Sequence, residues 1–126
     1  SGGEAACRVE KRNEIFSPGE KFTWLEEMDG FGWNHRTWNM DLTTPYWVDP
    51  FAIWHNERST FGFADGHAEK HQWLEKSTIN LARRMIDSLE DSQSVKGEAV
   101  PANELRDWEW ARQHYIPGKI PASLRR

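Results

Sequence analysis

Three of the chain's five histidines fall in one stretch of twenty residues, "WHNERSTFGFADGHAEKHQW", which covers positions 54 to 73. Imidazole nitrogens bind metals and act as general bases, and a nearby carboxylate can orient an imidazole for that work. His55 with Asp65 is therefore a candidate base and carboxylate, and His67 with His71 is a candidate metal-binding pair. Whether either pair can act depends on the elements that position its members.

A β-hairpin is the element that this stretch predicts. Asp65-Gly66 between two alternating segments favours a two-residue type I′ turn, because that turn needs a positive φ at both central residues. We expect strands over residues 59 to 64 and 67 to 73. The turn sets a register with three facing pairs: Ala64 with His67, Gly62 with Glu69, and Thr60 with His71.

Alternation along these strands assigns each side chain to a face. One face is expected to belong to the core: Phe61, Phe63, Ala68 and Leu74. The other is expected to be either a solvated surface or a shallow binding groove: Thr60, Gly62, Ala64, His67, Glu69, His71 and Trp73.

Distances along an extended strand count against both chemical pairs. His67 and His71 share a face at about 13 Å, too far apart for one metal ion, and solvated strand histidines are the better interpretation. The extended residues between His55 and Asp65 span about 20 Å. We expect His55 to tether the preceding aromatic loop to the far end of the hairpin, near Glu75 and Lys76, while Asp65 serves the turn.

Other candidate chemistry is sparse. Glu27 and Asp29 lie on one side of a predicted strand and form a weak alternative site for calcium or for a carboxylate pair, with a solvated edge as the ordinary interpretation. Ser59 lacks the glycine-flanked elbow of a nucleophile, and Cys7 has no base near it in the sequence. We expect no cofactor and no enzymatic activity.

Composition narrows the class of protein. The 126 residues carry a net charge of −4, which does not suggest a nucleic-acid groove or an anionic membrane surface. Eight tryptophans are several times the usual share, and such side chains either fill a core or act as flat stacking platforms. No window is apolar enough for a transmembrane helix or a signal peptide.

The remaining pattern predicts one α+β domain over residues 21–126, with a small antiparallel sheet made of hairpins and one or two helices. Residues 1–20 are expected to be a linker, and the ordered fold to start near Lys21. A strand from Lys21 should place Phe22, Trp24 and Met28 on one face, and residues 36–42 should form the returning strand.

Downstream, Pro45 and Pro50 bracket an irregular aromatic loop. Helices are expected over 78–90, capped by Ser77, and over 104–115, capped by Asn103, with a surface loop over 91–102 between them. The second helix should place Leu105, Trp108, Ala111 and Tyr115 on one side.

The spacing of His55, nine residues and then Asp65-Gly66 resembles the prepilin-type processing-associated domain family that is named after it. "FADGH" and the following W-x-x-K also resemble that family, as do "KFTWLEEMDGFGWN" and "PYWVDPFAIWH" upstream and, more weakly, "ARQHYIP". The likeness covers roughly residues 20–80. The resemblance assigns no chemistry to the motif residues His55, Asp65, Gly66 and His67, and we interpret them as structural because the motif folds a hairpin.

The resemblance implies a pilin-like or pseudopilin-like globular head whose N-terminal hydrophobic helix is absent from the sequence given. Such a head would serve a type II secretion or type IV pilus-like assembly, with other pilin-like subunits or secretion components as partners. Its location would be periplasmic or at the cell surface, held to the membrane only through that helix. It predicts an uncovered apolar strip where the helix would lie.

A glycan-binding module is the alternative function, motivated by the tryptophans. The candidate binding surface for this function is Trp47, Trp54, Glu69, His71 and Trp73. Coplanar exposed indoles would favour it, and burial of the tryptophans would argue against it.

Overall fold

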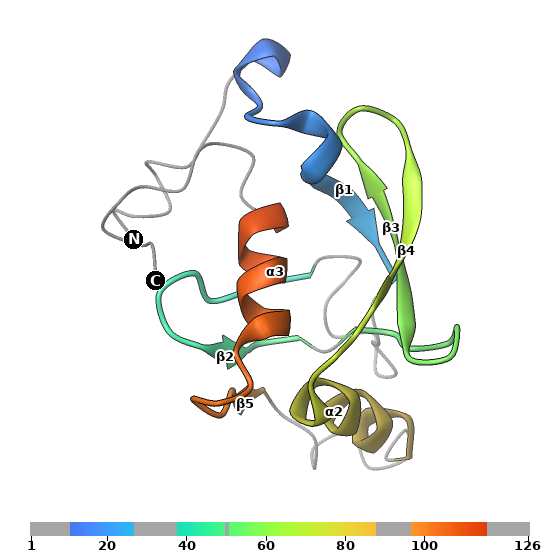
Figure 1. The fold of residues 1–126 in the computed structure, drawn as a ribbon, viewed down its shortest axis with the longest axis vertical. Coiled ribbons are helices and arrows are strands. Elements are labelled where there is room, and N and C mark those ends of the chain that lie inside the picture. Colours follow the sequence, from blue (N-terminus) through green and yellow to red (C-terminus); the bar gives the residue numbers. More distant parts are fainter. Residues whose placement is uncertain (1–10, 27–37, 50, 88–96, 116–126) are drawn as a thin grey trace.

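The computed structural model describes residues 11–26, 38–49, 51–87 and 97–115, except for the side chains of residues 12 and 85–87. Within these ranges the chain forms the predicted small α+β fold with antiparallel sheets (Figure 1). In chain order the elements are η1 (Arg12–Glu14), η2 (Pro18–Glu20), β1 (Phe22–Leu25), β2 (Tyr46–Trp47), β3 (Arg58–Phe63), β4 (Ala68–Gln72), α2 (Lys76–Asp87), β5 (Glu98–Ala99) and α3 (Arg106–Tyr115).

The main sheet has the strand order β1-β3-β4, with antiparallel pairing throughout. A second, two-stranded sheet pairs β2 with β5. In Figure 1, α3 and the small sheet lie to one side of the main sheet, and α2 lies beyond its lower end. Among the described residues, no helix has the length and apolar character needed to span a membrane.

The predicted hairpin forms from β3 and β4, but its turn has three residues instead of two. The N–H of Gly66 donates to the carbonyl of Phe63 (2.9 Å), and the N–H of Phe63 donates to the carbonyl of His67 (2.8 Å). Only Gly66 has a positive φ, of 96°, so Asp65 is spared the left-handed backbone that a type I′ turn requires. The expected type I′ turn is therefore wrong.

The extra turn residue shifts the pairing by one position. Three observed pairs replace the predicted ones: Phe61 with Glu69, Gly62 with Ala68, and Thr60 with Lys70. Because side chains alternate, this shift exchanges the two faces of β4. His71 and Trp73 lie on the core side, whereas Ala68 and Leu74, which were expected in the core, are exposed.

A β-bulge changes the faces of β1 as well. Phe22 pairs with Phe63 and Trp24 pairs with Gly62, so the register shifts between these two positions. Phe22 packs against the core, while the Trp24 side chain points outward and is exposed. The expectation that Phe22 and Trp24 share a face is wrong because the bulge inserts one residue between them. Met28 lies outside the described residues.

Three other segments differ from expectation. Residues 38–42, the described part of the expected returning strand, form no strand. The Asp49 carboxylate accepts the N–H of Asn39 (2.7 Å), and the Asp41 carboxylate accepts the N–H groups of Thr43 and Thr44. Such bonds between side chains and the backbone compete with sheet pairing. The described structure begins ten residues before Lys21, with η1 and η2. The loop expected over 91–102 contains β5 in its described part.

Both helices occur close to where they were predicted, but their predicted N-caps are wrong. α2 begins at Lys76, so Ser77 lies inside its first turn. α3 begins at Arg106, three residues after Asn103. The prediction that four residues at α3 face one side is confirmed. Trp108 and Ala111 are buried, and two partly buried residues pack against the same core, Leu105 and Tyr115.

Aromatic side chains make up most of the core between the main sheet and α3. Phe51 stacks on Trp73 with ring centroids 4.2 Å apart, and Trp73 meets Phe61 and Trp110 edge to face. The buried indole of Trp73 donates to the Ser59 hydroxyl (2.7 Å), which in turn donates to the carbonyl of Ala52. Most of the tryptophans among the described residues therefore serve as core fillers.

Candidate functional site

His55 pairs with a carboxylate, but not with Asp65. Its Nε2 donates to Oε1 of Glu26 (3.2 Å), while the other Glu26 oxygen accepts the N–H of Thr60 (2.9 Å). The backbone of Glu26 also bonds Thr60 and Ala52. His55 therefore joins the aromatic loop to β1 and β3.

The position of His55 is as expected but its partner is not. Asn56 and Glu57, which follow it, have positive φ values of 57° and 62°, and the carbonyl of Glu57 accepts the N–H of Trp73 (3.1 Å). These contacts put His55 at the end of the hairpin far from the turn. The Glu75 carboxylate itself bonds Arg106, and the expected neighbourhood of His55 with Glu75 and Lys76 stays a prediction.

Electrostatics show that the Glu26 carboxylate is committed to this junction. Burial raises its pKa, but hydrogen bonds from Thr60 and His55 more than offset that effect, so the pKa of Glu26 is lowered. One Glu26 oxygen thus holds the backbone of β3 while the other holds the imidazole of His55. The pair is suited to a structural role.

Asp65 serves the turn, as predicted. Its Oδ1 accepts the backbone N–H of His67 (3.1 Å) and the Nδ1 of the same histidine (2.5 Å). The backbone bond from His67 lowers the pKa of Asp65, and the Asp65 carboxylate raises the pKa of His67. The His67 ring also lies parallel to Phe63 and 3.5 Å from the Glu69 carboxylate. These exposed contacts stiffen the hairpin tip.

His71 lies in a different environment from His67. Its ring stacks on Trp110 with centroids 3.5 Å apart and planes 12° apart, and His114 stacks on the same indole at 4.2 Å. Burial and the nearby His114 lower the pKa of His71 to about 4. His71 is thus a neutral, partly buried side chain that packs against the core. Among the described residues no group of three His, Cys, Asp or Glu side chains could hold a metal ion.

The candidate glycan surface is divided between the core and the solvent. Trp47 and Trp73 are buried, at 2% and 1% exposure, so neither can stack on a ligand. Trp54 is 58% exposed, and Glu69 is exposed on β4. This surface is therefore not formed as predicted.

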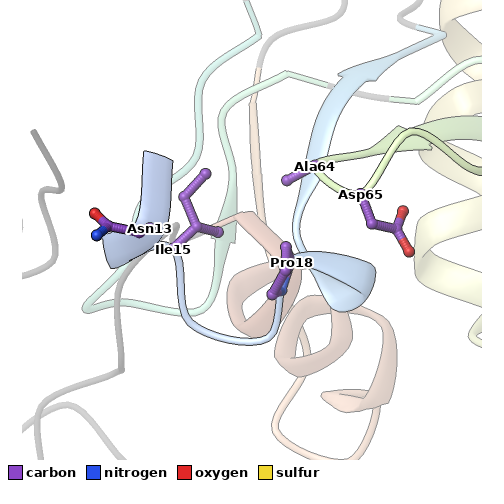
Figure 2. Close-up of a pocket in the computed structure, with 5 residues that line it drawn as sticks. All are labelled: Asn13, Ile15, Pro18, Ala64 and Asp65. Atoms are coloured by element: carbon purple, nitrogen blue, oxygen red, sulfur yellow. The ribbon is translucent and has the colours of Figure 1, made fainter. Parts of the chain in front are cut away.

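A groove of about 380 Å³ lies between the N-terminal turns and the hairpin tip. Figure 2 shows Ile15, Pro18 and Ala64 around it, Asn13 beyond Ile15, and the Asp65 carboxylate directed away from the other side chains. The sequence offered no signal for it, because residues 1–20 were expected to be a linker. Its lining has no nucleophile or base apart from the Asp65 carboxylate, which the turn already uses.

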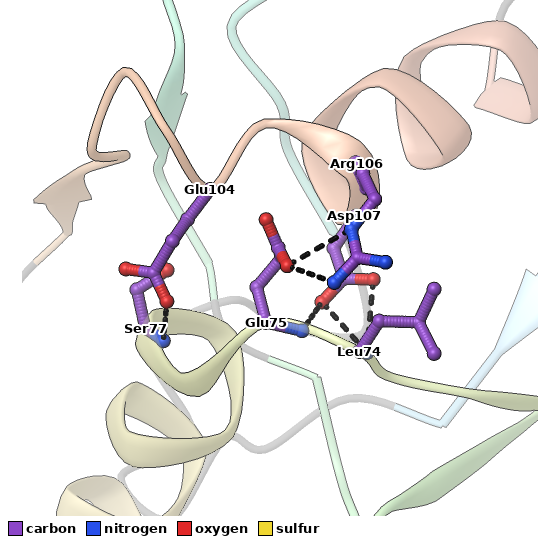
Figure 3. Close-up of polar contacts among 6 residues, drawn as sticks. All are labelled: Leu74, Glu75, Ser77, Glu104, Arg106 and Asp107. Atoms are coloured by element: carbon purple, nitrogen blue, oxygen red, sulfur yellow. Dashed lines mark hydrogen bonds and ion pairs between the residues drawn. The ribbon is translucent and has the colours of Figure 1, made fainter.

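A cluster of carboxylates lies where β4 leads into α2 (Figure 3). The buried Asp107 accepts the N–H groups of Leu74 (3.1 Å) and Glu75 (2.9 Å), and Glu104 accepts the N–H of Ser77 (3.3 Å). Burial raises the pKa of Asp107, and its hydrogen bonds only partly offset this. Arg106 closes the cluster by binding the Glu75 carboxylate (2.6 Å).

This cluster supplies acceptors at the junction of β4 and α2. Backbone N–H groups at the start of a helix need acceptors, and Glu104 in the turn before α3 accepts that of Ser77. Asp107 of α3 accepts the N–H groups of the two residues that precede the helix, Leu74 and Glu75. Sequence reasoning missed Asp107 and Glu104 because their partners lie about thirty residues away. Glu27 and Asp29, the weak metal alternative, lie outside the described residues.

Comparison with protein families, with curated proteins and with solved structures finds no match in any of the three. A functional conclusion therefore depends on the residues and contacts described above and on the motif resemblance.

Proposed function

We propose that this chain is a non-enzymatic, pilin-like or pseudopilin-like head domain that acts through protein contacts in a type II secretion or type IV pilus-like assembly. In this proposal the head is periplasmic or faces the cell exterior. A hydrophobic N-terminal helix preceding the sequence given would connect it to the membrane. Its partners are other pilin-like subunits or secretion components.

The observation that carries the proposal is the use of the motif residues. His55 binds Glu26 at one end of β3, and Asp65 with Gly66 closes the turn at the other end. A motif that holds both ends of a strand is what a structural head domain requires.

The resemblance also predicts an uncovered apolar strip. Large apolar residues that are 39% to 58% exposed occur on separate segments of the described chain: Phe16, Trp24, Val48, Trp54 and Leu74. Apolar side chains exposed singly are normal on a protein surface, so these residues do not identify the strip.

The test is to express the gene with its upstream region in a bacterium with and without a prepilin peptidase. Mass spectrometry of the N-terminus should find a short leader removed only when the peptidase is present. Cross-linking in those cells should then join the head to pilin-like partners. An ordinary secretory signal, or a mature protein released without pilin-like partners, would refute the proposal.

A further inference from the structure

The outer face of the main sheet, which points away from α3, carries a regular set of side chains. Alternation places three residues of β3 on it, Arg58, Thr60 and Gly62, and their partners on β4. The pairs form rows: Trp24 with Gly62 and Ala68, then Thr60 with Lys70, then Arg58 with Gln72. In Figure 1 no described helix covers this side of the sheet.

Trp24 forms a flat platform at one end of the outer face. A Cβ on Gly62 would lie 1.8 Å from Nε1 of Trp24 and 2.2 and 2.4 Å from the two atoms that flank it. Such short distances to both flanking atoms place that Cβ over the ring face, because an approach in the ring plane would leave them farther away. One indole face therefore covers Gly62, and the side chain is still 51% exposed. Position 62 must be glycine for the Trp24 indole to lie flat against the strand, because any Cβ there would overlap the ring.

The rest of the outer face is polar and cationic. Lys70 is exposed, and Arg58 donates to Oε1 of Gln72 (3.1 Å). Neither cation forms an ion pair with a carboxylate of the described residues. Glu26, beside Thr60, is already bound to His55. In a chain with a net charge of −4, the two cations Lys70 and Arg58 therefore outnumber the one carboxylate, Glu26, in these rows.

Geometry sets the size of a matching ligand. Successive rows on one face of a strand are about 7 Å apart, so Lys70 lies one row and Arg58 two rows from the platform.

A hydrophobic helix would bury Lys70 and Arg58 without partners, at a large desolvation cost. A polysaccharide strand instead offers ring faces that stack on an indole and hydroxyls that can accept from the amide of Gln72. Its acidic groups would neutralise the cations.

We propose that the outer face binds an anionic polysaccharide, with one sugar ring stacked on Trp24 and acidic groups of the following sugars bound by Lys70 and Arg58. This inference does not depend on the pilin-like assignment. It also differs from the tryptophan surface predicted from the sequence, because that set did not include Trp24.

The test is isothermal titration calorimetry of the chain with dextran sulfate, polygalacturonate and neutral dextran at low and at physiological salt. Both anionic polymers should bind, and binding should weaken as salt increases. Trp24→Ala and Lys70→Glu should each weaken binding about tenfold. Trp54→Ala and Lys76→Glu, which change an exposed indole and an exposed lysine elsewhere, should change it less than about twofold.

Several results would overturn the proposal. They are no binding of either anionic polymer, equal binding of neutral dextran, or equal losses in the Trp54 and Lys76 controls. Self-association that is lost in Trp24→Ala, seen by analytical ultracentrifugation without polysaccharide binding, would assign the face to a second copy. Lys70 is an exposed side chain, so Lys70→Glu keeps the test valid even if Trp24→Ala fails to fold. Failure here would leave leader cleavage and subunit cross-linking unaffected.

Discussion

Acidification should destabilise this fold through His71. The imidazole lies between β4 and α3, stacked on Trp110, and its Nε2 has no hydrogen-bond partner among the described residues. In the unfolded chain the same group has an ordinary pKa of 6.5, whereas in the folded protein the pKa falls to about 4. Between these two values the unfolded state binds the proton and the folded state does not, so the free energy of unfolding falls as the pH falls.

The magnitude follows from the two pKa values. Their separation of about 2.5 pH units corresponds to at most about 3.5 kcal/mol, since one pH unit is equivalent to about 1.4 kcal/mol. His71 is partly exposed, and solvent screening reduces this figure. We therefore expect a loss of about 1 kcal/mol between pH 7 and pH 5, with the remainder lost by about pH 4.

Other titratable groups also change the free energy of unfolding between pH 7 and pH 4. Burial also lowers the pKa of His114, which adds to the same loss, although Glu20 and Glu69 oppose it and Lys21 reinforces it. The pKa of His67 is raised, so its contribution to stability is present in acid and is lost as the pH rises. The carboxylates with lowered pKa values lose their contribution only below about pH 4.5.

Urea unfolding followed by tryptophan fluorescence at several pH values between 7 and 4.5 measures the effect. His71→Phe keeps a ring against Trp110 and removes the proton, so its unfolding free energy should depend less on pH than that of the native chain. His67→Gln is the matched control and should retain the full acid loss. An unchanged pH dependence in His71→Phe would refute the reasoning.

Three further predictions use the same unfolding assay. Asp107→Ala should lose about 3 kcal/mol because it leaves two buried N–H groups without an acceptor, and a loss below about 0.5 kcal/mol would show that water replaces the carboxylate. Gly62→Ala should lose about 1–3 kcal/mol by displacing the indole, but much less in a Trp24→Ala background; equal losses in both would rule out the indole as the cause. His55→Gln and Glu26→Gln should be non-additive by about 0.5–1 kcal/mol, and strict additivity would mean that their bond adds nothing.

The hairpin could be predicted from the sequence, but its register could not be read from the turn alone. Asp65-Gly66 fits both a two-residue turn and the observed three-residue turn, and the two differ by one position. Burial decides between them. The observed register places the large apolar side chain of Trp73 in the core, whereas the predicted one would have buried Ala68 and exposed Trp73.

Two kinds of contact had no local signal. The bulge in β1 inserts a residue where the alternation looks regular, and it moves Trp24 to the outer face. The acceptors for the start of α2 come from Asp107 and Glu104, which meet it only after α3 has packed. Sequence patterns report local backbone preferences, and these features depend on tertiary contacts instead.

The nine residues between His55 and Asp65 have a structural explanation. Two residues with positive φ reverse the chain after His55, the six residues of β3 follow, and Ala64 begins the turn. His55 and Asp65 therefore mark the two ends of one strand. One residue more or fewer would move Phe61 out of the core or His55 away from Glu26, because side chains alternate along a strand. A spacing fixed by strand length accounts for the motif without requiring any reaction.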